Sequence, residues 1–120
     1  MADRVLMISW GEPVRGREER ALEVFNESLG LAGRMQQDGR IESFDVILLN
    51  PNSDSGGCII MKGSSQQIGA LDVDEEFTRN TIDASLIVEK LAHHVGYTNE
   101  GVAQQMALYQ EAIDKVPQLH

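Results

Sequence analysis

Apolar residues form short continuous runs at three places along the chain, and this pattern predicts three β-strands. The runs span Val5 to Trp10, Ile41 to Leu49 and Cys58 to Lys62. Each run has the length of a strand and is bounded by strong turn formers such as Gly and Pro. Residues 50–57 concentrate these turn formers, so we expect the second and third runs to form a β-hairpin with a long tip.

Residues Arg17 to Asp38 carry apolar side chains at steps of three and four, which is the spacing of one helical face. Gly39 is placed to end this helix. The interior glycines Gly30 and Gly33 each cost about 1 kcal/mol relative to alanine. We therefore expect close packing of this helix on a sheet to offset that cost, or the helix to bend there.

Two further helical segments are predicted after the third run. Residues 64–71 start with two serines, which suit a helix N-terminus, and form a short helix. Asp72 or Asp74 is a good cap for a second helix, whose acidic first turn suits the helix dipole. The residues that this second helix is expected to bury are Phe77, Thr81 and Ile82.

The C-terminal third of the chain predicts one more strand and one more helix. Ser85 to Val95 is the strand candidate, although its apolar residues also fit a helix. Asn99 is a good cap for a helix over Glu100 to Ile113. Apolar residues recur in that helix at steps of four, three and four, which predicts an amphipathic helix. They are Val102, Met106, Tyr109 and Ile113.

The order of strand, helix, strand, strand, helical segment and strand indicates one α+β domain over residues 1–120. Such an order forms a four-stranded antiparallel sheet of the ferredoxin-like type, with helices on one face. Both alternating sets of residues in the first three strands are apolar, as Leu6 and Met7 or Ile59 and Ile60 illustrate. A sheet that is apolar on both faces needs a second cover. Another copy of the chain is the simplest cover.

This pattern resembles the dimeric α+β barrel superfamily, in which two ferredoxin-like sheets pair face to face into an eight-stranded barrel. The stretches GREERALEVFNESLGLAGRMQQDGRIESFDVILL and EEFTRNTIDASLIVEKLAHHVGY are similar to stretches of uncharacterised bacterial members. The resemblance implies a homodimer and a small cavity, either inside each half or at the centre of the barrel. It leaves the function open, because functions vary widely between members of the superfamily.

Charge and cysteine content restrict the partners and the compartment. The 120 residues carry a formal net charge of -9, with a pI near 4.6. Such a charge argues against nucleic acid or an anionic membrane surface as the main partner, because both would repel the protein. The single Cys58 cannot form an internal disulfide, and the N-terminus lacks the apolar run of a signal peptide. We therefore expect a cytoplasmic protein.

His93 is a weak candidate for a catalytic residue. Adjacent residues on a strand point to opposite faces, so His93 and His94 are not expected to bind one metal ion. On the predicted strand Glu89 shares a face with His93, and a Glu with a His can act as orienter and base. A purely structural role for both residues is the competing and simpler interpretation.

The end of the first strand and the loop after it hold the candidates for ligand binding. Trp10 can stack on a ligand at the mouth of the barrel, although a tryptophan at the end of a strand more often belongs to core or dimer packing. Arg15 or Arg17 can hold a carboxylate through its planar guanidinium, but local pairing with an acidic neighbour is the alternative. Asp45 lies either at the solvated start of its strand or inside the barrel, and Cys58 is expected to be inert.

No cluster of residues reaches the specificity of a catalytic, cofactor or metal motif, so the sequence supports several functions. The first hypothesis is a small-ligand-binding or accessory dimer without catalysis. The second is a cofactor-free monooxygenase or isomerase acting on a small aromatic or polyketide-like compound. Haem binding would require His93 or His94 as an axial ligand. A module that acts through protein contacts, with the C-terminal helix as its interface, is the remaining class.

Overall fold

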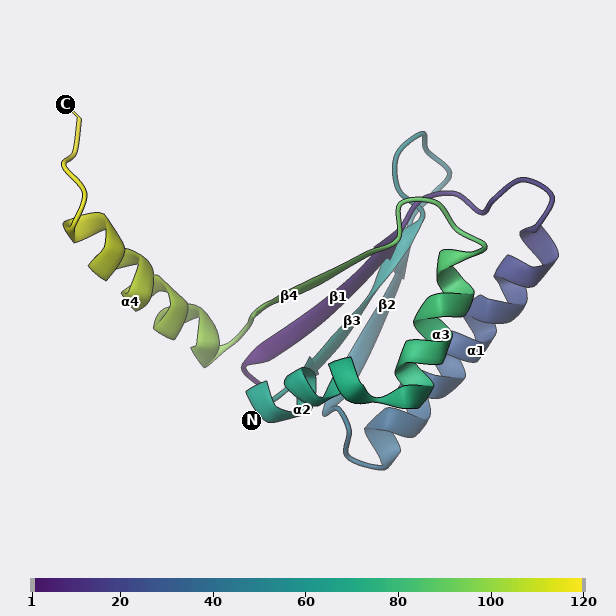
Figure 1. Cartoon of the computed structure of the whole chain (residues 1–120), viewed down its shortest axis with the longest axis horizontal. Helices are drawn as coiled ribbons and strands as arrows, with labels where there is room; N and C mark the ends of the chain where they lie inside the picture. Colours follow the sequence, from purple (N-terminus) through teal and green to yellow (C-terminus); the bar gives the residue numbers. More distant parts are fainter. Residues whose placement is uncertain (1, 120) are drawn as a thin grey trace.

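The computed structural model describes residues 2–119 and confirms the predicted order of elements (Figure 1). The strands and helices are β1 (Arg4–Trp10), α1 (Glu18–Gln37), β2 (Ser43–Leu48), β3 (Gly57–Gly63), α2 (Ser65–Ala70), a short 3-10 helix (Leu71–Val73), α3 (Glu75–Ser85), β4 (Ala92–Tyr97) and α4 (Glu100–Asp114). Each strand prediction other than the last agrees with the structure to within about two residues.

The four strands form one antiparallel sheet in the order β2-β3-β1-β4. Helices α1, α2 and α3 lie on one side of this sheet, which we call the covered face, and the other side is the open face (Figure 1). The register decides which side chains share a face. Leu6 pairs with Met61 and Val95 on the covered face, whereas Met7 pairs with Ile60 and His94 on the open face.

The core lies between the covered face and the helices. Alternate residues of β1 and β3 meet the apolar stripe of α1 there, and Ile68, Leu71 and Phe77 close the end near α2. The buried residues of this cluster that come from β1, β3 and α1 are Leu6, Ile59, Met61, Leu31, Ala32 and Met35. Full burial of one such large side chain stabilises the fold by roughly 1.5–3 kcal/mol. A second, smaller cluster joins Ala21 and Val24 of α1 to Ile87.

Local hydrogen bonds explain where the two middle helices begin. The Ser64 hydroxyl accepts a hydrogen bond from the Gln67 N–H, and the Gln67 side chain accepts one from the Ser64 N–H. This reciprocal pair is a capping box. Asp74, rather than Asp72, caps α3 by accepting a hydrogen bond of 2.9 Å from the Phe77 N–H.

Two expectations about side chains on α1 and α3 are wrong. Phe77 is buried as predicted. Thr81 is only partly buried, because it lines a pocket between α3 and the sheet, and Ile82 is 55% exposed, because it lies on the solvent side of α3. The interior glycines of α1 do not mark a close approach to the sheet. A Cβ atom on Gly33 would meet nothing within 4 Å, and one on Gly30 would meet the tip of Arg34 at 3.5 Å.

The prediction of a strand from Ser85 to Val95 is wrong over its first half. Residue Ser85 still belongs to α3, residues 86–91 form a loop, and β4 begins at Ala92. The loop pairs with the segment after β1 instead of entering the sheet. The Gly11 N–H donates to the Glu89 carbonyl (2.7 Å), and the Glu89 N–H donates to the Glu12 carbonyl (2.9 Å). The apolar residues there therefore cover the end of the core and do not form a ladder.

Helix α4 is present where it was predicted, but its surroundings differ from the expectation. Figure 1 shows it leaving the end of β4 so that the sheet lies between α4 and the pair α1 and α3. The radius of gyration is 16.9 Å, whereas a compact chain of this length has about 14 Å. The apolar stripe of α4 is exposed along its whole length, and this amphipathic helix packs on its own chain only in its first turn, where Gly101 is buried.

Candidate functional site

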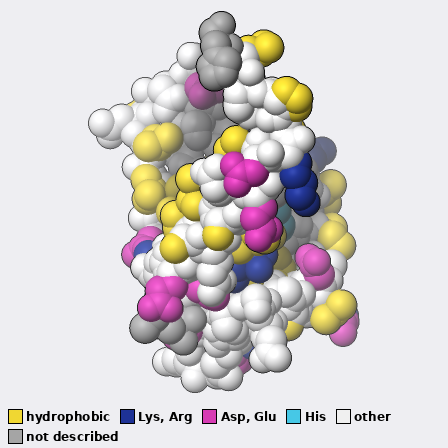
Figure 2. Space-filling view, turned by 90° about the vertical axis from the view of Figure 1, so that its left-hand side faces the viewer, with side chains coloured by type: hydrophobic (Ala, Val, Ile, Leu, Met, Phe, Trp, Pro, Cys, Tyr) yellow, Lys and Arg dark blue, Asp and Glu magenta, His cyan; other side chains and the backbone are white. Residues whose placement is uncertain are grey.

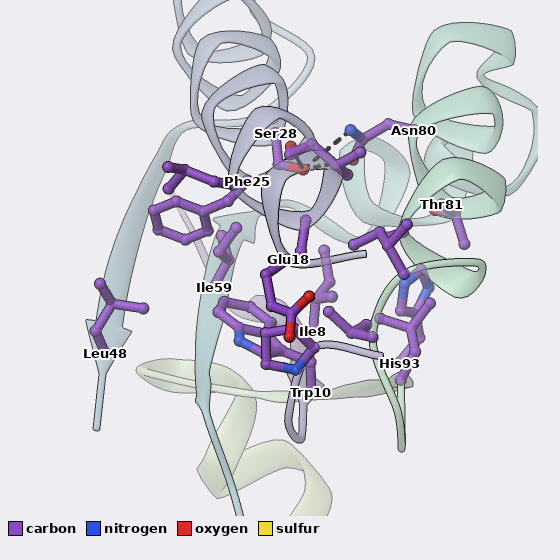
Figure 3. Close-up of a pocket in the computed structure, with 18 of the residues that line it drawn as sticks. Ile8, Trp10, Glu18, Phe25, Ser28, Leu48, Ile59, Asn80, Thr81 and His93 are labelled. Carbon is purple, nitrogen blue, oxygen red and sulfur yellow. Dashed lines mark hydrogen bonds between the residues drawn. The ribbon is translucent and has the colours of Figure 1, made fainter. Parts of the chain in front are cut away.

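An apolar pocket of about 470 Å³ lies between the covered face and helices α1 and α3 (Figure 3). It lies inside one protomer, not between two sheets. Residues Ile8, Trp10 and Ile59 form its floor on the sheet, and residues such as Phe25 and Thr81 form its walls. Pockets of roughly 300–1,000 Å³ with mostly apolar walls and a few polar groups are typical of small-molecule sites.

Trp10 is the largest side chain of the pocket. It is the last residue of β1 and points to the covered face, because it continues the alternation of Leu6 and Ile8. Its ring meets Phe25 edge-on, with 6.0 Å between ring centroids. The backbone of Gly56, in the hairpin tip, packs against the Trp10 ring. A Cβ atom on Gly56 would lie 2.9 Å from the Trp10 ring and 2.5 Å from the Gly11 carbonyl, so the position requires glycine.

A polar pair joins the two helices above the pocket (Figure 3). The Ser28 hydroxyl donates to the Val24 carbonyl at 2.8 Å and accepts from the Asn80 side chain at 2.9 Å. Both Ser28 and Asn80 line the pocket and are partly buried. They hold α1 and α3 at a fixed separation and place a hydroxyl and an amide at the wall. Nothing in the sequence indicates this pair, because the two residues are 52 positions apart.

His93 lies on β4 opposite Ile8, and its ring lines the pocket from the covered face. The Phe77 ring lies 5.7 Å away, centroid to centroid. His93 belongs to an edge strand and stays partly exposed, but the loss of water on one side of the ring lowers its pKa. The Asp72 carboxylate opposes this shift and His94 adds to it. The imidazole of His93 is therefore neutral at pH 7 and can accept a proton.

Glu18 is the charged residue of the pocket wall. It stands in the first turn of α1, where a carboxylate suits the helix dipole, and accepts a hydrogen bond of 2.8 Å from the Gly16 N–H. No Lys or Arg lines this pocket within residues 2–119. A bound molecule would thus meet a negative and an apolar surface.

Three of the sequence candidates lie outside the pocket. The Arg17 guanidinium donates to the Leu86 carbonyl (2.7 Å), so it joins the start of α1 to the loop before β4. Arg15 lines a separate, more polar depression against the hairpin tip, residues 50–56. Glu89 belongs to the loop and not to β4, and the predicted shared strand face with His93 is therefore wrong. Trp10 and His93 are the candidates that the structure brings into one pocket.

The open face holds the other residues that the sequence singled out. His94 pairs with Met7 there, so the two histidines point to opposite faces as expected. Asp45 is exposed, and its carboxylate lies 3.2 Å from the Lys62 ammonium. Cys58 is a partly buried free cysteine of β3. Within residues 2–119, no group of three His, Cys, Asp or Glu side chains is arranged to hold a metal ion.

Neither the models of protein families nor the curated proteins contain a match to this chain. Among solved structures, a dimeric protein of unknown function with a ferredoxin-like fold from Bacteroides fragilis is similar, with a TM-score of 0.61 and 14% identity. The match covers 79% of this chain and 96% of the other. The chain has the ferredoxin-like fold. A dimeric ferredoxin-like protein of unknown function from Jannaschia sp. gives a TM-score of 0.57 at 13% identity, over 80% of this chain and 98% of the other.

These neighbours agree with the fold class and with the resemblance to uncharacterised bacterial proteins that the sequence suggested. At such low identity the likeness concerns the fold, and it assigns no chemistry to the pocket. In the part of the chain that the structure describes, none of the helices has the length and apolar character needed to cross a membrane.

Proposed function

We propose that this protein is a homodimer that binds a small, uncharged aromatic or apolar molecule in the pocket between its sheet and helices α1 and α3, without catalysing a reaction. The 470 Å³ apolar pocket carries this proposal. Aromatic rings of Trp10 and Phe25 offer flat surfaces for stacking. The Ser28 and Asn80 side chains offer one hydrogen-bonding point, which suffices to orient a small ligand.

The charges of the wall favour an uncharged ligand. Glu18 lines the pocket, and no cationic side chain among residues 2–119 does so. A ligand carboxylate would lose water without gaining an ion pair, which is costly in an apolar site. A carboxylate held by Arg15 or Arg17 is not part of this proposal, because Arg15 lines a separate depression and Arg17 is already bonded to the Leu86 carbonyl.

The homodimer is supported by the open face of the sheet. Val5, Met7 and Ile60 stand there in the middle of the sheet with no helix of their own chain above them. All three are partly exposed, and contiguous apolar surfaces that reach the solvent mark contact sites. Both solved neighbours are described as dimeric. A cytoplasmic location and the absence of nucleic-acid partners stay predictions from the charge and the N-terminal sequence.

The fluorescence of Trp10, the sole tryptophan of the chain, provides a direct test. We expect 2-naphthol to change this fluorescence in a saturable way and 2-naphthoate to bind at least about tenfold more weakly, a difference of about 1.4 kcal/mol. Thr81→Phe fills the pocket and should abolish the response. Thr78→Phe on the exposed side of α3 is the matched control and should retain it. Equal binding to both variants would refute a site in this pocket.

His93 favours one alternative, a cofactor-free monooxygenase or isomerase for a small aromatic or polyketide-like compound. A neutral imidazole in the pocket can remove a proton from an activated carbon of the ligand, which is the first step of both reactions. With anthrone as the probe, oxidation by O2 would convert the methylene to a carbonyl and release one water. Oxygen uptake that His93→Phe removes would support the alternative. If no oxygen is consumed and no isomerised product forms, the alternative is refuted and the binding function without catalysis stands.

A further inference from the structure

A second hollow adjoins the apolar pocket at the end of the sheet. It has a volume of about 390 Å³ and lies between the hairpin tip, residues 50–56, and the segment that follows β1, residues 11–18. We call it the tip depression. Pro13 and Glu18 line both the tip depression and the apolar pocket, so the two spaces meet at these residues. A ligand that fills the apolar pocket can therefore extend into the tip depression.

The walls of the two spaces follow one another along the chain. Trp10 and Leu48, the last residues of β1 and β2, line the apolar pocket, and the next residues, Gly11 and Leu49, line the tip depression. Backbone hydrogen bonds fasten the hairpin tip to this place. The Gly56 N–H donates to the Trp10 carbonyl (2.8 Å), and the Leu49 N–H donates to the Gly56 carbonyl (3.0 Å). The tip is therefore fixed to the floor of the pocket.

The side chain of Asn52 holds the hairpin tip in one shape. Its amide group donates to the Asn50 carbonyl (2.8 Å) and to the Ser55 carbonyl (2.6 Å). Its oxygen accepts hydrogen bonds from the N–H groups of Asp54 and Ser55, both at 2.8 Å. The opposite wall, residues 11–14, is held by backbone bonds to the loop before β4. Because both walls are ordered before a ligand arrives, binding there costs little conformational entropy.

The polar side chains of the tip depression carry both charges and include donors and acceptors. Arg15 supplies donors, Glu12 and Glu18 supply acceptors, and the side chains of Asn50 and Ser55 supply both. Within residues 2–119, the side chains of Glu12, Arg15 and Asn50 have no bonding partner, so a ligand can use them. Two carboxylates face one guanidinium, and an anion would therefore meet more negative than positive charge. Hydroxyl groups suit this wall, because they donate to carboxylates and accept from a guanidinium.

We propose that the tip depression is a second subsite, which binds an uncharged polyhydroxylated group, such as a sugar ring, that an aromatic ligand carries. The inference deepens the proposed function and rests on it, because the aromatic part of the same ligand occupies the apolar pocket. Glu18 stands where the two parts of such a ligand join, since it lines both spaces (Figure 3). The ligand class that fits both subsites is an aromatic glycoside.

The fluorescence of Trp10 tests this subsite with two naphthalene ethers. The probe is 2-naphthyl β-D-glucoside, and 2-methoxynaphthalene is its control, because it keeps the ether oxygen and lacks the sugar. We expect the glucoside to bind at least about tenfold more tightly, which a few hydrogen bonds to the sugar supply. Equal affinities would overturn the polar subsite and leave binding in the apolar pocket intact. No saturable response to either compound would overturn both proposals.

Arg15→Met removes the guanidinium and keeps the length of the side chain, which is exposed, so the fold should persist. We expect the glucoside to bind about fivefold more weakly to this variant and 2-methoxynaphthalene to bind within about twofold of its wild-type affinity. Lys115→Met is the matched control. It removes the same charge at the end of α4, on the side of the molecule that Figure 2 shows.

This control is remote because α4 follows the end of β4 that pairs with Arg4, whereas the hairpin tip lies at the Trp10 end of the sheet. An equal loss of glucoside affinity in both variants would show an effect of net charge and would overturn a contact between Arg15 and the sugar.

A charged sugar tests the preference for an uncharged group. 2-Naphthyl β-D-glucuronide replaces the hydroxymethyl group of the glucoside with a carboxylate. We expect it to bind at least about fivefold more weakly than the glucoside, because Glu12 and Glu18 repel it. Tighter binding of the glucuronide would overturn the uncharged ligand class.

Discussion

Helices α1 and α4 carry apolar stripes of similar spacing and have opposite surroundings. In α1 the stripe residues Val24 and Met35 are 2% and 0% exposed, whereas Met106 in the stripe of α4 is 61% exposed. α1 crosses the covered face and contributes to the core, while α4 leaves the sheet at the end of β4 (Figure 1). The period of an apolar stripe thus gives the side of the helix on which it lies, but it does not say which chain covers that side.

The largest expected effect comes from the same truncation in the two stripes. Met35→Ala should lower the free energy of unfolding by about 2–5 kcal/mol, because it opens a cavity in the core. Met106→Ala should cost less than about 0.5 kcal/mol in the monomer. Urea unfolding at several protein concentrations measures both. The cost of Met106→Ala should grow with concentration if the stripe packs on a second copy, and a concentration-independent large loss would contradict our account of α4.

The first turn of α4 packs tightly against the start of β1. Gly101→Ala places a Cβ atom against the Asp3 carbonyl and should destabilise the protein by about 1–3 kcal/mol through overpacking. Thermal unfolding measures this loss. Asn99→Gly is the milder companion, because glycine accepts the left-handed backbone and loses just one exposed side-chain bond. If Gly101→Ala leaves the stability unchanged, the contact with β1 does not fix the position of the first turn of α4.

The cap of α3 should make part of the stability depend on pH. Burial raises the pKa of Asp74, but the hydrogen bond from the Phe77 N–H and the Arg40 guanidinium 3.0 Å away outweigh it, so the pKa of Asp74 is lowered. A carboxylate with a lowered pKa stabilises the fold above its unfolded pKa of about 3.9, and this contribution is lost as the pH falls through the folded value.

Asp74→Ala removes this contribution together with the cap of α3. We expect a loss of about 1–2 kcal/mol at pH 7. The difference from the wild type should be smaller at pH 3, which lies below the unfolded pKa of about 3.9, because the unfolded chain then takes up the proton that the folded carboxylate still resists. Unfolding curves at pH 7 and pH 3 measure the two differences. A difference that stays the same at both pH values would show that the carboxylate charge plays no part. By contrast, the side chain of Asn99 makes no capping bond to α4.

The smallest effect is a gain in α1. Gly33→Ala meets no atom within 4 Å, so the better helix propensity of alanine should raise the free energy of unfolding by about 0.5–1 kcal/mol. Thermal unfolding measures the gain. A loss of stability would mean that the outer side of α1 packs closely on something that a single chain does not contain.

The pocket could be predicted in part from the sequence. Trp10 and His93 were candidates on account of their residue types and strand positions, and both line the pocket. Their neighbours Ser28 and Asn80 were missed, because a polar pair formed across two helices leaves no periodic signal. Glu89 was misassigned because apolar residues near it fit a strand, whereas their actual role is to cover the end of the core beside Ala21 and Val24.

The order of the elements, the ferredoxin-like class and the apolar character of both sheet faces could be read from the sequence alone, because these features depend on short-range periodicity and turn formers. Tertiary structure alone decided that the pocket lies under α1 and α3, that residues 86–91 leave the sheet and that α4 stands apart from its chain. These outcomes depend on contacts between residues far apart along the chain, such as Asp3 with Gly101. Local patterns do not contain that information.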